Sequence, residues 1–147
     1  MATLRKITGT VVGAVTAIGA LGFAAPSADA ATTPCEPQAK ACVQLSTGQA
    51  WLQDNGSVTT GPVPVAPGLP SYPTPKGIFH VQYKDIDHYS RQYNGPMPYS
   101  VFFTNTGVAF HQGSLQRKSH GCVHLSHQDA VTFYNTLHPG DEVQVVA

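Results

Sequence analysis

Short runs of alternating apolar and polar side chains dominate the sequence after residue 40. A period of two is typical of β-strands that bury one face. It predicts strands at residues 42–45, 49–53, 57–60, 78–83, 99–103, 107–111 and 142–146. The sequence Asp54-Asn55-Gly56 separates two of these runs and favours a tight hairpin turn. We therefore expect a mainly β domain.

One segment, from Ser126 to Leu137, has a helical period instead. Ser126 can cap its first turn, and Asp129, three residues later, completes a capping box. The apolar positions fall on one stripe, formed by Ala130, Phe133, Tyr134 and Leu137. This pattern predicts a single helix that packs on the strands and follows Cys122.

Residues 61–75 interrupt the alternation with a high density of proline. Proline has no N–H to donate to a sheet and is rare inside central strands. The segment is therefore expected to be a stiff surface loop rather than a strand. Its six prolines are Pro62, Pro64, Pro67, Pro70, Pro73 and Pro75.

The first thirty residues have the pattern of a secretory signal peptide. Arg5 and Lys6 precede an apolar stretch from Val11 to Ala25, and Ala28-Asp29-Ala30 fits a cleavage site. A membrane anchor is less favoured, because the apolar stretch is shorter than the ~20 residues that span a bilayer. We expect residues 1–30 to be a signal peptide, 31–41 an N-terminal segment and 42–147 one folded domain, in an exported protein.

Charge excludes some classes of partner. Of the eight Lys or Arg and eight Asp or Glu in the chain, loss of residues 1–30 leaves six basic and seven acidic residues. No basic stripe indicates nucleic-acid binding, and no polybasic segment indicates a membrane surface. We expect a monomer that is not inserted in a membrane after cleavage of the signal peptide.

The interpretation of the three cysteines depends on the compartment in which the protein folds. In an oxidising environment Cys35 and Cys42 can close a small loop that tethers the N-terminus, which leaves Cys122 over. A leftover cysteine in a secreted protein is a reactive thiol or an intermolecular partner. Two free thiols or a disulfide-linked dimer fit the count equally well.

The most informative segment is Ser119-His120-Gly121-Cys122-Val123-His124, with His111 at the end of the preceding predicted strand. A thiol with an ordinary pKa of ~8.5 is mostly protonated at neutral pH, so catalysis needs a neighbour such as a histidinium to stabilise the thiolate. The glycine before the cysteine allows a tight turn that exposes amide N–H groups to an oxyanion.

Two other interpretations of the same residues remain open. The imidazoles and the thiol could bind zinc, although only one cysteine lies in the histidine-rich run, which is unlike the paired clusters of structural zinc sites. The candidate ligands are His111, His120, Cys122, His124 and His127. Cys122 could also be a small buried apolar residue. The secretory signal pattern favours the interpretation of Cys122 as a nucleophile over these two.

The sequence resembles the L,D-transpeptidase catalytic domain of the YkuD type, from about Cys42 to Val146. The most specific match is His111 followed by Ser119-His120-Gly121-Cys122, which resembles the family signature. Three further segments resemble it in the same order: Ala50-Trp51-Leu52 with its hairpin turn, Thr74-Pro75-Lys76-Gly77-Ile78-Phe79, and Met97-Pro98-Tyr99.

The resemblance implies a β-sandwich or barrel and a two-step acyl transfer on peptidoglycan tetrapeptide stems, without metal or cofactor. Cys122 would attack the carbonyl before the terminal D-alanine, His111 would act as the base, and His120 would support the site. The amides of His120, Gly121 and Cys122 would bind the oxyanion. The residues expected to contact the substrate are Tyr99, Ser119, Gln112 and Met97.

Three positions depart from the family pattern. His111 and Cys122 are 11 residues apart, which is a shorter interval than is usual. Gln112 replaces a glycine or serine, which is harmless if the main-chain carbonyl is what matters. His124 replaces an asparagine or arginine, which puts recognition of the stem in question. The alternative function is a noncatalytic wall-binding or metal-binding module that retains the fold.

Overall fold

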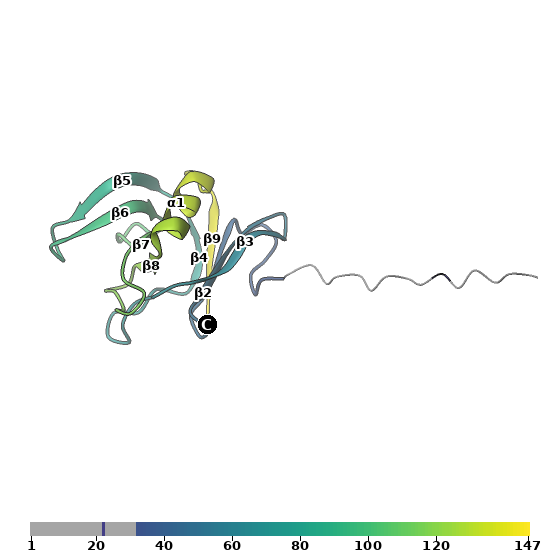
Figure 1. Cartoon of the computed structure of the whole chain (residues 1–147), viewed down its shortest axis with the longest axis horizontal. Helices are drawn as coiled ribbons and strands as arrows, with labels where there is room; N and C mark the ends of the chain where they lie inside the picture. The colour runs from purple at the N-terminus through teal and green to yellow at the C-terminus, as the bar shows by residue number, and fades with distance from the viewer. Residues whose placement is uncertain (1–21, 23–31) are drawn as a thin grey trace, which may run out of the picture.

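Two β-sheets and one helix make up the part of the chain that this computed structural model describes, residues 22 and 32–147 (Figure 1). The expected signal peptide lies outside the described residues, apart from Gly22. Among the described residues, no helix is long and apolar enough to cross a membrane.

The first sheet has five strands in the order β3-β2-β1-β9-β4. All neighbours are antiparallel except β1 and β9, which run parallel. The strands are β1 (Ala41–Gln44), β2 (Gln49–Asp54), β3 (Ser57–Pro64), β4 (Gly77–His80) and β9 (Glu142–Val146). The predicted turn at Asn55-Gly56 joins β2 to β3, with both residues at positive φ.

The second sheet has four strands in the order β5-β6-β7-β8, and it carries the candidate site. Its strands are β5 (Tyr83–Ser90), β6 (Gly95–Phe102), β7 (Ala109–Gln112) and β8 (Val123–Leu125). The β5–β6 hairpin extends away from the rest of the domain (Figure 1). β7 and β8 run parallel, so the chain crosses over through residues 113–122 between them.

The predicted helix forms as α1 (His127–Thr136) and covers one face of the second sheet, against β6, β7 and β8. Ser126 caps it by accepting a hydrogen bond from the Asp129 amide at 3.1 Å. The rings of Phe133 and Phe110 meet edge to face, 5.1 Å between centroids. One apolar core therefore fills the space between the two sheets and the helix, and the expected sandwich with one helix is confirmed.

The proline-rich segment is only in part the surface loop that the sequence predicted. Its first four residues belong to β3, an edge strand, where a missing N–H leaves no gap in the ladder. Beyond them, Ala66 pairs with His124 and Gly68 with Ser119. Ala66 and Thr74 are 4% and 3% exposed. Non-proline residues supply the N–H donors that the prolines lack, so part of the segment packs inward while residues 70–73 remain exposed.

The sequence also failed to predict β5, β8 and the first half of β6. β5 has no clean alternation because much of it is exposed on both faces. Pro96 and Pro98 argued against a strand, but they lie where β6 pairs only with β5. Tyr99, at φ +56°, interrupts the pairing and breaks the period of two.

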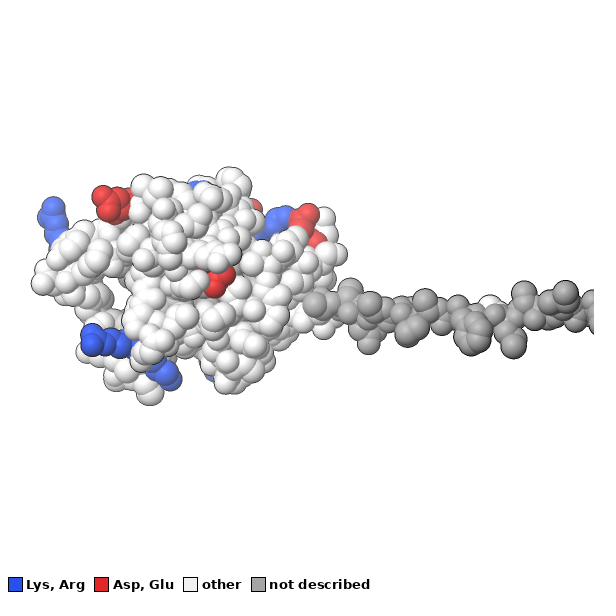
Figure 2. All heavy atoms as spheres, in the orientation of Figure 1, with Lys and Arg blue, Asp and Glu red and all other residues white. Residues whose placement is uncertain are grey.

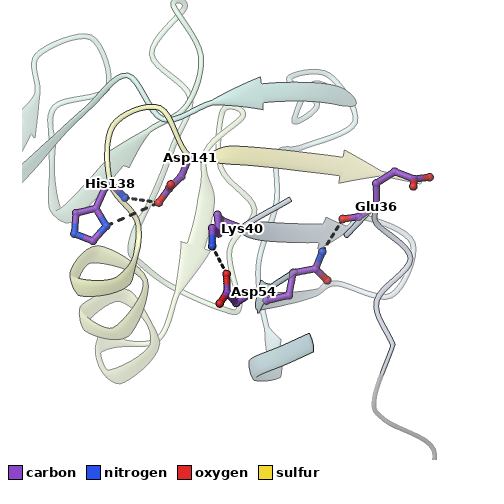
Figure 3. A network of polar contacts seen from close by, with 6 residues as sticks. Glu36, Lys40, Asp54, His138 and Asp141 are labelled. Atoms are coloured by element: carbon purple, nitrogen blue, oxygen red, sulfur yellow. Dashed lines mark hydrogen bonds and ion pairs between the residues drawn. The ribbon is translucent and has the colours of Figure 1, made fainter. Parts of the chain in front are cut away.

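Polar contacts tie the N-terminal segment and the end of the helix to the first sheet (Figure 3). Lys40 pairs with Asp54 on β2, and the Gln53 amide donates to the Glu36 carbonyl at 2.7 Å. Asp141 accepts from the His138 amide at 2.8 Å beyond the helix. Figure 2 shows that charged side chains are few and scattered over the face in view.

The structure joins Cys35 to Cys42 by a disulfide and leaves Cys122 unpaired among the described cysteines. We predict one titratable thiol per chain in the folded, non-reduced mature protein, and three after reduction and unfolding. Thiol titration with a chromogenic disulfide measures both numbers. Three reactive thiols before reduction would contradict the pairing.

Candidate active site

His111 and Cys122 lie on the same face of the second sheet. The register of the parallel pair sets His111 opposite His124 and Phe110 opposite Val123, so Cys122, one residue before β8, lies level with Ala109. Residues that face each other across a ladder point to one side, and alternate residues share that side. The thiol accordingly packs against Met97, Phe102 and Ala109, the members of a second apolar cluster.

The opposite face belongs to the core. Phe110, Val123 and Leu125 are fully buried there beneath α1. This burial fixes the register, since a slip of one residue would turn the histidine and the cysteine into the core. Packing on one face thus positions the reactive groups on the other.

The ring of His111 is held in one tautomer. Its Nδ1 lies 2.8 Å from the main-chain oxygen of Gln112. A carbonyl oxygen only accepts, so Nδ1 carries the proton and Nε2 is bare. Because the main chain makes this contact, the glutamine side chain at position 112 does not disturb it. His111 is therefore prepared to accept a proton through Nε2.

Burial favours the neutral forms of both the His111 imidazole and the Cys122 thiol. Burial lowers the pKa of His111 to about 4; its bond to Gln112 opposes the shift, and nearby His124 and His88 add to it. Burial also raises the pKa of Cys122, against a smaller opposing effect of a hydrogen bond to the Ala109 main chain. The thiolate and histidinium pair stays a prediction. In the structure the thiol donates to the Gly107 carbonyl, with 3.7 Å between Sγ and the oxygen.

This burial makes a prediction about stability. Folded His111 binds a proton only near pH 4, whereas in the unfolded chain it binds one near pH 6.5. Stability is therefore complete above pH 6.5 and is lost as the pH falls toward 4, by about 3 kcal/mol from this residue alone. Urea unfolding of the wild type and His111→Gln at several pH values isolates the effect. Parallel curves for the two proteins would contradict it.

The peptide between Gly121 and Cys122 is oriented by a buried threonine. The Thr74 hydroxyl donates to the Gly121 carbonyl at 2.7 Å and accepts from the Gly68 amide at 2.9 Å. In a trans peptide the N–H points opposite to the C=O, so the Cys122 N–H points away from Thr74. Within the described residues it has no hydrogen-bond partner. It is the best placed donor for an oxyanion.

The Gly121 amide, by contrast, is already engaged. It donates to the Ser119 hydroxyl at 3.0 Å, and that hydroxyl donates in turn to the Cys122 carbonyl. Gly121 has φ +128°, a conformation that L side chains rarely adopt. Of the three expected oxyanion amides, Gly121 is therefore a loop contact and not a donor to substrate.

The loop that carries the cysteine is fixed at both ends by the proline-rich segment. Ser119 donates to the Pro67 carbonyl at 3.1 Å and accepts from the Leu69 amide at 2.9 Å. His124 makes the corresponding pair of bonds with Ala66, at 2.9 and 3.1 Å. The candidate nucleophile Cys122 therefore lies on a turn that isolated β-bridges fix on both sides.

Comparison with known proteins agrees with this geometry. The sequence model of one family, described as the L,D-transpeptidase catalytic domain (YkuD), matches residues 38–145. The chain belongs to this L,D-transpeptidase family. The match includes His111 and Cys122 together with the segments that support them.

Individual relatives are longer than this chain. The probable L,D-transpeptidase 3 of Mycobacterium tuberculosis is 33% identical over an alignment of 104 residues that covers 58% of this chain and 38% of the relative. An L,D-transpeptidase from Stackebrandtia nassauensis has a TM-score of 0.71 at 28% identity, covering 83% of this chain and 62% of that one. Another from M. tuberculosis H37Rv has a TM-score of 0.69 at 26% identity, covering 76% and 58%. The chain spans less than two thirds of each relative.

Several residues expected to contact the substrate of an L,D-transpeptidase lie elsewhere. Ser119 is 7% exposed, with its hydroxyl used inside the loop. The ring of Tyr99 meets His127 and Tyr134 edge to face on the helix side, opposite the face of Cys122. The sequence motif that contains Tyr99 did not predict its positive φ, which turns the side chain toward the helix.

Two other expected contacts are close to the site but constrained. Met97 is buried in the cluster beside the thiol, so it supports Cys122 from below. The side-chain oxygen of Gln112 lies 2.9 Å from Nδ1 of His127. Gln112 acts on His111 through its main chain, as described above.

His120 is exposed and held between two tyrosines. Its ring stacks on Tyr93 from the β5–β6 turn at 4.1 Å and meets Tyr72 edge to face at 5.0 Å. These contacts direct the His120 ring toward the β5–β6 hairpin. This orientation favours a supporting role for His120 over the role of base. Sequence reasoning missed both tyrosines, since neither the turn nor the proline-rich segment was expected near the cysteine.

The zinc interpretation finds no ligand set in the described part of the chain, where no three His, Cys, Asp or Glu side chains converge.

Thr74 is the most important residue that sequence reasoning did not single out. It belongs to a segment that resembles the family, but its bond to Gly121 joins residues 47 apart in sequence. Only the tertiary fold brings them together.

Proposed function

We propose that this chain is a secreted cysteine acyltransferase that acts on peptidoglycan tetrapeptide stems through a thioester. The observation that carries the proposal is the bare Nε2 of His111 on the same face as an unpaired thiol, with the Cys122 N–H oriented away from Thr74. Membership of the L,D-transpeptidase family supports the substrate class.

In the first step, Sγ of Cys122 attacks the carbonyl that precedes the terminal D-alanine. The thiol proton moves to Nε2 of His111, and the carbonyl electron pair moves to oxygen, where the Cys122 N–H stabilises it. The Gln112 carbonyl faces the imidazolium that forms and stabilises its charge. When the C–N bond breaks, His111 returns its proton to the leaving amine, D-alanine departs and a thioester remains.

In the second step, an acceptor attacks the thioester. His111 takes a proton from an amine of a neighbouring stem, or from water, as the new bond forms, and Cys122 recovers its proton when the C–S bond breaks. An amine gives an L,D-crosslink and water gives a shortened stem. Both outcomes use the same residues, so the chain acts as a transpeptidase or a carboxypeptidase according to the acceptor.

The location follows from the substrate. Peptidoglycan lies outside the cytoplasmic membrane, and residues 1–30 have the pattern of a signal peptide. We infer that the mature chain works at the cell wall as a monomer, on stem peptides rather than on nucleic acid.

The experiment incubates the mature protein with a tetrapeptide stem, with and without a second stem as amine donor, and measures released D-alanine. Release with a crosslinked product establishes transpeptidation, and release with a tripeptide product establishes hydrolysis. A stem that ends in L-alanine is the matched control and should release nothing. Absence of D-alanine with either acceptor, from protein whose thiol still titrates, would refute the proposal and favour a noncatalytic wall-binding module.

A further inference from the structure

His124 stands directly opposite His111 across the β7–β8 ladder. The two rings meet edge to face, with 4.8 Å between centroids. The main chain of His124 is fixed by its pair of hydrogen bonds to Ala66. The ring therefore projects from a rigid position beside the base.

The His124 ring is bound to the crossover loop that follows His111. Its Nδ1 lies 2.8 Å from the Ser114 carbonyl and 3.2 Å from the Arg117 carbonyl. Both partners only accept, so one N–H serves both. This one side chain therefore holds two points of the crossover loop, at residues 114 and 117.

Gly113 packs flat against the same ring. A Cβ at position 113 would lie 2.7 Å from Cδ2 and Cγ of His124, closer than any real contact. The backbone of Gly113 does not itself require glycine, since its φ is in the ordinary range. Contact with the imidazole is what excludes a side chain there.

The peptide between Gln112 and Gly113 connects this contact to the base. Its N–H donates to the Leu125 carbonyl at 3.0 Å, and its carbonyl accepts from Nδ1 of His111 at 2.8 Å. Any shift of Gly113 away from the His124 ring moves the carbonyl that fixes the His111 tautomer.

We propose that His124 is a positioning residue for His111: by holding Gly113 and the loop, it keeps the Gln112 carbonyl on Nδ1 and leaves Nε2 bare. On this proposal His124 acts on the loop and the base rather than on the stem. The proposal rests on the proposed function only for its effect on turnover, because tautomer and thiol reactivity are properties of the protein alone.

The test is a double-mutant cycle of Gly113→Ala, His124→Ala and the combined variant. Nitrogen-15 spectra of labelled histidine report the His111 tautomer, and iodoacetamide alkylation at neutral pH reports the reactivity of Cys122. Each single variant should populate the second tautomer and slow alkylation about tenfold, the change that corresponds to ~1.4 kcal/mol of coupling. The combined variant should be no slower than His124→Ala, because the added Cβ then meets no ring.

His127→Ala is the matched control. It removes a histidine that contacts the Gln112 side chain but not its carbonyl, so the His111 tautomer should not change. Thermal unfolding is measured for each variant, and His124→Ser replaces His124→Ala if the latter does not fold, since serine leaves the same space beside Gly113. Losses that simply add in the combined variant, or an unchanged tautomer without His124, would overturn the proposal. Failure of the wild type to release D-alanine would refute the function but not this positioning.

Discussion

Cys122→Ala is expected to lower D-alanine release by at least about 10⁴-fold while the protein remains folded. The variant deletes the atom that forms the thioester, and no second thiol can replace it, since Cys35 and Cys42 are joined to each other. Cys122 is half-buried at the edge of a small cluster, so the lost packing costs about 1 kcal/mol or less. Release of D-alanine and thermal unfolding measure the two effects.

Cys122→Ser is the control for this variant, because it keeps the shape of the side chain but replaces the thiol with a much poorer nucleophile. Both variants should retain the tautomer of His111 and the wild-type unfolding temperature within a few degrees. Turnover by Cys122→Ala at more than one hundredth of the wild-type rate would mean that another residue carries the reaction.

The second large effect separates the two candidate bases. His111→Ala should lower turnover by about 10²–10⁴-fold, as expected for loss of a general base. It should also suppress alkylation of Cys122 near neutral pH, since a thiol whose pKa is raised then has no imidazole to accept its proton as it attacks. The rate should then rise only at alkaline pH, as for an ordinary buried thiol.

His120→Ala is the matched comparison. Its ring contacts Tyr72 and Tyr93, so its loss should weaken turnover while most of the thiol reactivity remains. Alkylation and D-alanine release are measured on both variants over the same pH range. If His120→Ala suppresses alkylation and His111→Ala does not, the role of base passes to His120.

The parts that the sequence predicted well are those with strong local signals. The capping box at Ser126, the stripe on α1 and the alternation in β9 each specify their element within a few residues of the chain. The candidate nucleophile and base also have a local signal, in one short motif and the strand before it, and their roles stay predictions. Local chemistry and local period agree at these positions.

The parts that failed depend on tertiary contacts. Proline suggested an exposed loop at residues 61–75, yet residues 66–69 form hydrogen bonds with Ser119 and His124, on either side of Cys122. The motif suggested that Ser119 faces the substrate, yet its hydroxyl closes the turn from within. Neither the burial of His111 nor the resting charge of the site can be obtained from residue spacing, because desolvation depends on the whole fold.

The most direct test of the account is the mass of the intact protein after brief incubation with a tetrapeptide stem. The account predicts an added mass equal to the stem without its D-alanine, located on Cys122 by peptide mapping and removed by an amine acceptor or slowly by water. Cys122→Ala should show no adduct under the same conditions. An adduct on another residue, or D-alanine release by the wild type without any adduct on Cys122 in single-turnover sampling, would contradict the thioester mechanism.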